Sequence, residues 1–220
     1  MSARLITSRN PRIPVPIHNR DDDLESFWHV LLWTALRRCE HRMQMDQTVS
    51  ELYRLFEHFY IETTGEAKGG ADKRTFLMAV RAGVGMKLCS EPLQHILSAT
   101  ASVLASRYIL DEKKEDNIRK VAEIWDTVRM KNPDFQEEDP RLRKAFRDEV
   151  YTDEKLESEL ESSIPIWRNR RKLASPQWME AIFQAALNDP QADWATGSTN
   201  VERSFSAPRS ERYETKVLPE

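Results

Sequence analysis

Apolar side chains recur along most of this chain at spacings of three and four residues, which is the period of an α-helix. Between residues 47 and 62 they stand at Val49, Leu52, Tyr53, Phe56, Phe59 and Tyr60. This spacing puts them on one face of a helix that packs against a core. No segment shows the regular alternation of apolar and polar residues that indicates a strand, so the pattern predicts an all-α fold.

The densest apolar run predicts a helix over residues 22 to 43. Its apolar side chains cover nearly every direction around the helix axis: Phe27, Trp28, Val30, Leu31, Leu32 and Trp33. A helix that is apolar on all sides is typically buried on all sides, so we expect this helix at the centre of the fold. Asp22, followed three positions later by Glu25, predicts a capping box at its start.

Start and stop signals predict four further helices. They run from Asp72 to Gly83, from Pro92 to about Tyr108, from about Glu115 to Met130, and from Ser175 to just before Asp189. Glycine commonly follows the last helical residue, and proline is favoured in the first turn, so these residues mark natural ends and starts.

The remaining segments are poor in apolar periodicity. Residues 1–21 carry three prolines and predict an extended leader that lies on another part of the molecule, ahead of a helical domain over residues 22–194. Within that domain, residues 133–170 are dense in charge and predict a solvated insertion with short helical pieces at Leu142 to Val150 and Asp153 to Leu160. Residues 195–220 predict a disordered tail.

Composition narrows the function classes. The 220 residues include 33 basic and 36 acidic side chains, and a net charge of −3 gives no general attraction to nucleic acid or to an anionic membrane. The longest apolar run, from Phe27 to Leu36, is too short to span a bilayer. Two cysteines, Cys39 and Cys89, are too few for a disulfide framework and favour an intracellular protein, cytoplasmic or nuclear.

One run of residues resembles a known family. The string Asp22-Asp23-Leu24-Glu25-Ser26-Phe27, continuing to Trp33, resembles the large central helix in the C-terminal lobe of fungal-type protein kinases, and casein kinases carry a similar DDLES string. Other segments similar in order and spacing are Leu55-Phe56, Gly65 to Gly70 with Lys73, Leu88 to Leu93, Ala105 to Tyr108, Trp178 to Glu180 and Ala186-Leu187. The resemblance covers about residues 1 to 194 and implies a helical subdomain like a kinase C-terminal lobe.

The resemblance also implies that the chain begins after the activation loop. In kinases the Gly-rich loop, the strand lysine, the H-R-D loop and the D-F-G motif all precede that point. The nearest match to H-R-D here is His41-Arg42-Met43, which lacks the carboxylate base. The family transfers phosphate from ATP to Ser or Thr, and we expect this chain to be an inactive, truncated relative that uses no cofactor. A truncated gene model and a genuine degenerate copy both remain open.

Three acidic residues are the structural candidates. Asp23 resembles the family's buried helix-start aspartate, which accepts hydrogen bonds from the catalytic loop. The alternative for Asp23 is a plain N-terminal helix cap, stabilised by the helix dipole by about 0.3–1 kcal/mol. Asp22 and Glu25 belong to the predicted cap. No catalytic, cofactor-binding or metal-binding residue is predicted.

A basic run near the end of the predicted insertion is the remaining candidate site. Arg168, Arg170, Arg171 and Lys172 follow Trp167 and would form a nuclear-import signal or a patch for an acidic partner, or else a solvated loop. Serines beside arginines in the tail are candidate phosphorylation sites: Ser204, Ser206 and Ser210.

An alternative function from another class is a helical interaction module, or pseudokinase scaffold, that docks onto a partner chain. Apolar area that a missing neighbour leaves uncovered would be its docking surface. A third possibility, residual nucleotide binding, predicts a thermal shift with Mg·ATP, and we expect none. The patterns predict neither nucleic-acid nor membrane binding and indicate no oligomeric state.

Overall fold

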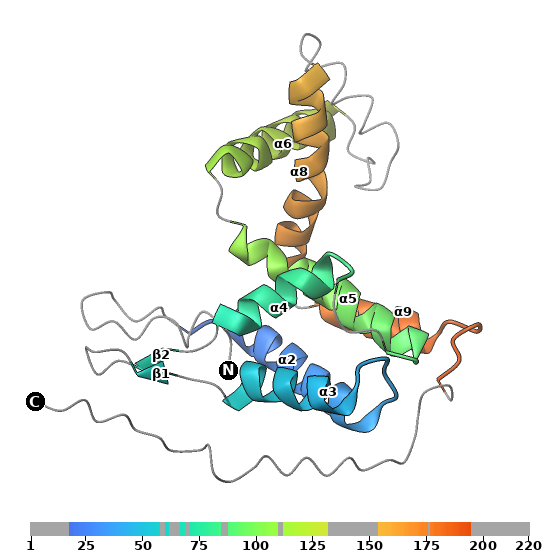
Figure 1. Ribbon diagram of the computed structural model, residues 1–220. Coiled ribbons are helices and arrows are strands. Elements are labelled where there is room, and N and C mark those ends of the chain that lie inside the picture. The colour runs from blue at the N-terminus through green and yellow to red at the C-terminus, as the bar shows by residue number, and fades with distance from the viewer. Residues whose placement is uncertain are drawn as a thin grey trace, which may run out of the picture.

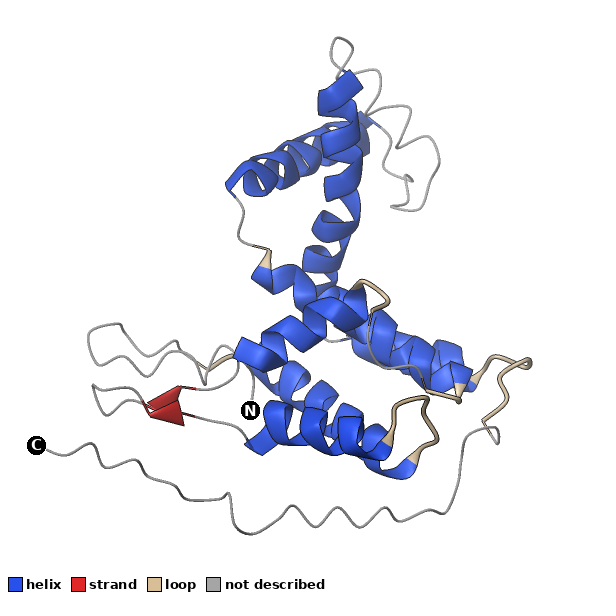
Figure 2. Cartoon of the chain, viewed as in Figure 1, coloured by secondary structure: helices blue, strands red, loops and turns tan. Residues whose placement is uncertain are grey.

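The structure is a computed structural model built almost entirely from helices (Figures 1 and 2). It describes residues 18–57, 60–61, 67–68, 71–84, 88–109, 112–131, 154–175 and 177–194. The all-α prediction is confirmed. Residues 1–17 of the predicted leader, residues 133–153 of the predicted insertion and the predicted tail, 195–220, lie outside the described residues.

Seven α-helices account for most of the described chain. Their bounds are α2 (Arg20–Arg38), α3 (Met45–Leu52), α4 (Ala71–Arg81), α5 (Glu91–Ala105), α6 (Glu112–Lys131), α8 (Glu154–Leu173) and α9 (Gln177–Leu187). A π-helical turn (Tyr53–Glu57) continues α3, a 3₁₀ turn (Ser106–Tyr108) continues α5, and β1 (Tyr60–Ile61) pairs antiparallel with β2 (Ala67–Lys68).

The helix α5 is the hub of the fold, since it packs against α2, α4, α8 and α9. Trp28 of α2 is fully buried, and its indole N–H donates a 3.0 Å hydrogen bond to the Leu97 carbonyl of α5. The prediction that α2 itself is buried on all sides is wrong. Phe27, Val30 and Trp33 remain 48%, 61% and 37% exposed. An apolar side chain becomes buried only where another element covers it, and a helical pattern cannot supply that element.

Apolar side chains form two buried clusters. The larger joins α2, α4, α5 and α9 and includes Leu32, Leu77 and Leu104, each fully buried. The smaller is formed mainly by α6 and α8, around Trp125 and Trp167, whose ring centroids lie 5.4 Å apart. Figure 1 shows α6 and α8 together at one end of the molecule, away from α2 and α3. Met78 of α4 packs against both clusters, and Leu173 of α8 belongs to the larger one, so the two are joined.

The start of α2 differs from the predicted capping box by one helical turn. Asn19 is the N-cap: its side chain accepts from the Asp22 amide, and the Asp22 side chain accepts from the Asn19 amide. The predicted box of Asp22 with Glu25 is therefore wrong. Asn, like Asp, is a strong N-cap residue, and a second Asx residue upstream shifts the box. The helix ends at Arg38, before the predicted Met43, because Cys39 is extended.

Two further predicted boundaries change. The helix predicted over 47–62 ends at Glu57, and Tyr60–Ile61 is the strand β1. The predicted solvated insertion is also wrong for its last part, where α8 runs unbroken from Glu154 to Leu173 with Pro165 inside it. In α8, Ile164 and Ile166 are only 7% and 4% exposed. These few buried residues stand among many charged ones, so the segment shows no clear helical period of apolar residues.

Several predicted helix ends are confirmed. The helix α4 ends at Arg81 and is closed by Gly83, whose φ of 70° is the left-handed conformation that glycine adopts at little cost. The Gly83 and Val84 amides donate to the carbonyls of Val80 and Ala79, which closes the last turn as a Schellman motif. Pro92 lies in the first turn of α5, as predicted.

None of the helices in the described segments is long and apolar enough to cross a membrane.

Candidate functional site

A buried ionic cluster ties the start of α2 to the end of α5. The Arg107 guanidinium donates to the Asp22 carboxylate at 3.0 Å, to Glu25 at 3.2 Å and to the Asp21 carbonyl at 3.0 Å. The side chains of Asp22 and Glu25 are 0% exposed and that of Arg107 is 11% exposed. One guanidinium fork thus serves two buried carboxylates and a backbone carbonyl, the geometry that arginine provides and lysine does not.

Tyr108, the residue after Arg107, completes the coordination of Glu25. Its hydroxyl donates a 2.6 Å hydrogen bond to the same Glu25 oxygen that accepts from Arg107. The other Glu25 oxygen lies 3.6 Å from Nε2 of His29. Glu25 is therefore surrounded by donors, as a buried carboxylate requires.

His29 and Lys73 extend the cluster toward α4. His29 is 2% exposed, and burial lowers its pKa, against the raising effect of the nearby Glu25 carboxylate. Burial likewise lowers the pKa of Lys73, while the Glu25 charge raises it. The Lys73 ammonium lies 5.4 Å from the centre of the Phe56 ring. Because these groups are buried, they hold helices together rather than meet a substrate.

The three acidic candidates at the start of α2 lie in different surroundings. Asp22 and Glu25 enter the buried cluster, whereas Asp23 is 68% exposed and its carboxylate lies 3.0 Å from the His18 ring. Asp23 is thus an acidic first-turn residue on the surface, and the cap position that its alternative assigned to it belongs to Asn19. Sequence reasoning did not single out Arg107 and Tyr108 as the partners of this cluster. Their only signal was that Ala105 to Tyr108 belongs to the resembling segments.

The basic run does not form one patch. Arg170 of α8 donates to both Glu115 oxygens, one of them at 2.7 Å, and to the carbonyls of Ser106 and Ile109 at 3.2 and 2.7 Å. The hydrogen bond from Arg170 lowers the pKa of Glu115. Arg170 thus fixes the turn after α5 against α6 and α8. The alternative reading of the run as a solvated loop is wrong, because the run forms the last turns of α8.

The neighbouring basic residues have different surroundings. The Arg171 guanidinium lies 5.4 Å from the Trp125 ring centre and 5.1 Å from that of Trp167. Arg168 is half-buried, whereas Lys172 is exposed. Arg170 and Arg171 of the predicted patch therefore have internal partners.

The tripeptide nearest to H-R-D is His41-Arg42-Met43. Its first residue, His41, has a structural role. His41 is buried, its Nε2 lies 3.1 Å from the Leu36 carbonyl, and its backbone pairs with that of Leu88. Its ring is therefore turned to the end of α2.

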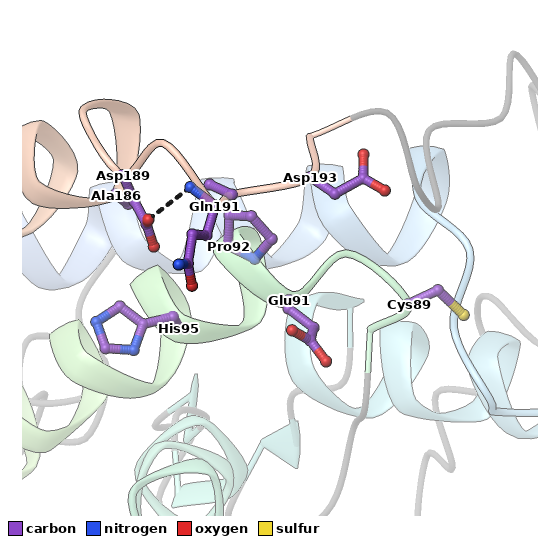
Figure 3. A pocket seen from close by; sticks show the side chains of 9 residues that line it. Cys89, Glu91, Pro92, His95, Ala186, Asp189, Gln191 and Asp193 are labelled. Atoms are coloured by element: carbon purple, nitrogen blue, oxygen red, sulfur yellow. Dashed lines mark hydrogen bonds between the residues drawn. The ribbon is translucent and has the colours of Figure 1, made fainter.

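An open cleft lies between the start of α5 and the loop after α9, and no sequence motif pointed to it. It has a volume of about 490 Å³. Figure 3 shows its lining: Cys89, Glu91, Pro92, His95, Ala186, Asp189, Gln191, Ala192 and Asp193. The described residues that line it include three carboxylates and no lysine or arginine, so this lining favours cations over anions. Its carboxylates are exposed, and the part of the chain that the structure describes holds no cluster of three or more His, Cys, Asp or Glu arranged for a metal ion.

An apolar surface on α2 is the other accessible feature. The α2 face consists of Phe27, Val30 and Trp33, at spacings of three residues. Phe27 meets Phe183 of α9 with ring centroids 6.1 Å apart, and the Arg37 guanidinium lies 4.6 Å from the Trp33 ring centre. The face thus continues toward α9 and is bordered by a cation.

Comparison of the chain with known protein families, with curated proteins and with solved structures finds no match.

Proposed function

We propose that this chain is a helical lobe of the fungal-type protein kinase kind that transfers no phosphate by itself. The ionic cluster at the start of α2 is the observation that carries the proposal. It joins two of the resembling segments, the DDLES string through Asp22 and Glu25, and the Ala105 to Tyr108 segment through Arg107 and Tyr108. A link across this sequence distance is what a lobe built around one central helix requires.

A comparison with the groups that phosphoryl transfer needs supports the proposal that this chain is inactive by itself. Transfer depends on holding ATP, Mg²⁺ and the acceptor hydroxyl with a base and metal-binding carboxylates. The sequence contains no H-R-D or D-F-G string, and His41 of the nearest tripeptide is buried against Leu36. The open cleft beside α5 carries negative charge, which disfavours a nucleotide phosphate.

Nucleotide binding and transfer are the direct test. We expect no change in the melting temperature with Mg·ATP and no transfer of labelled phosphate to a mixture of Ser- and Thr-containing proteins. Saturable binding of Mg·ATP, together with transfer by the purified chain, would overturn the proposal. Sequencing the transcript upstream of the Met1 codon addresses the kinase relationship separately, because an in-frame exon encoding H-R-D and D-F-G would support it.

A second candidate function is a docking module that binds a partner chain. The exposed α2 face favours it, because Phe27, Val30 and Trp33 leave apolar side chains in water on the central helix of the resemblance. A matched pair of baits, the wild-type chain and Val30→Glu, would test it. A partner recovered in stoichiometric amount by the first bait and lost from the second supports docking. Equal recovery by both baits argues against it.

A further inference from the structure

The accessible side of α2 carries a pattern of side chains that is symmetric about Val30. Phe27 and Trp33 stand three residues before and after Val30, and Asp23 and Arg37 stand seven residues before and after it. Seven residues are nearly two helical turns, so Asp23, Val30 and Arg37 lie almost in line along the helix. At about 100° per residue, Phe27 and Trp33 lie on opposite sides of that line. The order along α2 is therefore acidic, aromatic, Val, aromatic, basic.

The structure places opposite charges at the two ends of the exposed α2 face. Asp23, at the start, is 68% exposed and contacts the His18 ring at 3.0 Å. Arg37, at the end, is half-buried, and its guanidinium lies over the Trp33 ring. The apolar centre of the face is thus bordered by a carboxylate on one side and by a guanidinium on the other.

A surface with this order is complementary to itself when two copies of the helix run in opposite directions. A two-fold axis beside Val30 brings Val30 against Val30 of the second copy and Phe27 beside its Trp33. The same axis brings Asp23 to Arg37 of the second copy twice, once at each end. A parallel pair would instead set Asp23 against Asp23 and Arg37 against Arg37. Charge complementarity therefore selects the antiparallel pair.

We propose that a second copy of this chain covers the α2 face, with the two α2 helices antiparallel about an axis beside Val30. This inference rests on the docking function given above for the α2 face and names its occupant; it does not depend on the kinase relationship. A contact centred on three apolar side chains of each copy is a small interface. The dimer should therefore be weak and should form only as the protein concentration rises.

Sedimentation equilibrium of the full chain under reducing conditions tests for the dimer. The average mass of the wild-type chain should rise with concentration from that of one chain toward that of two. Val30→Glu places a charge beside the two-fold axis and should keep the chain monomeric over the same range. Because Val30 is exposed, this variant should melt as the wild type does when both are dilute.

Charge reversal tests the antiparallel order. Asp23→Arg and Arg37→Asp each set like charges against each other at both ends of the pair, so each should weaken self-association severalfold. An equal mixture of the two variants restores an opposite pair at both ends, so the mixture should associate severalfold more tightly than either variant alone. Adding Val30→Glu to one chain of the mixture should abolish this recovery. Asp126→Arg makes the same charge change at an exposed position of α6 and should dimerise like the wild type.

The opposite results overturn the proposal. A wild-type chain that stays monomeric at every concentration would exclude a second copy as the occupant. A dimer that tolerates Val30→Glu would show that the copies meet through another surface, and a mixture no tighter than its components would exclude the antiparallel order. A monomeric wild-type chain that binds another protein, and loses it with Val30→Glu, would overturn this inference and leave the docking function standing.

Discussion

Arg107 donates a 3.0 Å hydrogen bond to Asp22 across 85 residues of chain, and the Asp22 side chain is fully buried. Asp22 also accepts from the Asn19 amide, so the carboxylate that caps α2 is the one that holds the end of α5. A helix start and a tertiary contact therefore depend on a single side chain. This coupling makes the cluster the place where stability should respond most to substitution.

Arg107→Ala should destabilise the fold strongly. It leaves Asp22 and Glu25 buried without their cation, and breaking a buried ion pair costs about 3–5 kcal/mol. Arg107→Lys keeps the charge but not the fork, so its loss should be intermediate. Urea unfolding at pH 7 measures both. The control is Arg119→Ala, which removes a surface pair and should change stability by less than about 0.5 kcal/mol. Equal losses for the control and Arg107→Ala would refute the role of the cluster.

Acid should weaken the fold through His29. Burial lowers its pKa below the ordinary value of 6.5, so below that pH the unfolded chain binds a proton that the folded chain resists. Stability should therefore fall as the pH drops from 7 to 5. Glu25, 3.6 Å away, and the Lys73 charge act on the same ring.

His29→Leu removes the titrating ring and should reduce this pH dependence. The quantity to compare is the difference in unfolding free energy between pH 7 and pH 5, which cancels any change in packing that is independent of pH. His95→Leu, at an exposed position, is the control. A His29→Leu chain with the full wild-type difference would exclude His29 as the cause.

Arg170→Leu should loosen the junction between the two apolar clusters. It removes the hydrogen bonds to the Ser106 and Ile109 carbonyls and the pairing with Glu115. Amide exchange at pH 7 should quicken in α6 and α8 more than in α2. Lys172→Leu changes an exposed residue of the same helix and should leave exchange as in the wild type.

The Glu115 carboxyl reports the same junction by titration. Arg170 lowers the pKa of Glu115 below 4.5, so the stabilisation it adds is present above that pH and is lost as the pH falls through the lower folded value. In Arg170→Leu the pKa of Glu115, followed by NMR, should rise. An unchanged pKa would show that the contact does not persist in solution.

Trp28→Phe should be much more harmful than Trp33→Phe. Trp28 is fully buried and donates to the Leu97 carbonyl, so its replacement by Phe removes a buried hydrogen bond, at a cost of about 0.5–1.5 kcal/mol, and leaves a cavity beside α5. Trp33 is 37% exposed, and its loss should cost about 0.5 kcal/mol or less. Thermal unfolding of the two variants gives the comparison, and equal shifts would contradict the assignment of α5 as the hub.

Local sequence signals predicted where a helix ends better than they predicted which residues of the helix are buried. Gly83 closes α4 as predicted because the left-handed conformation is a property of that residue alone. The cap of α2 was placed a turn late, since Asn19 and Asp22 are both good caps and the sequence does not rank them. The sequence did not predict α8 as one helix, because its buried residues Ile164 and Ile166 stand in a segment rich in charged residues. Their burial depends on packing against α6.

The sequence likewise indicated only some residues of the buried ionic cluster. Asp22 and Glu25 stood out from their position at a helix start, and both are in the cluster. Their partner Arg107 lies 85 residues from Asp22 and 82 from Glu25, and no local pattern relates such positions. Arg170 and its basic neighbours were predicted to form one patch. That prediction is wrong because residues close in sequence need not share a surface.

The sequence by itself determined that this chain forms amphipathic helices, and where most of them begin and end. Those properties depend on side chains within one or two turns of each other. Only the tertiary structure decided that α5 and not α2 is the hub, that Asp22 is buried while Asp23 is exposed, and that Arg107 and Arg170 are internal clamps. Burial and ion pairing depend on which distant segments meet, and that is set by the packing of the whole chain.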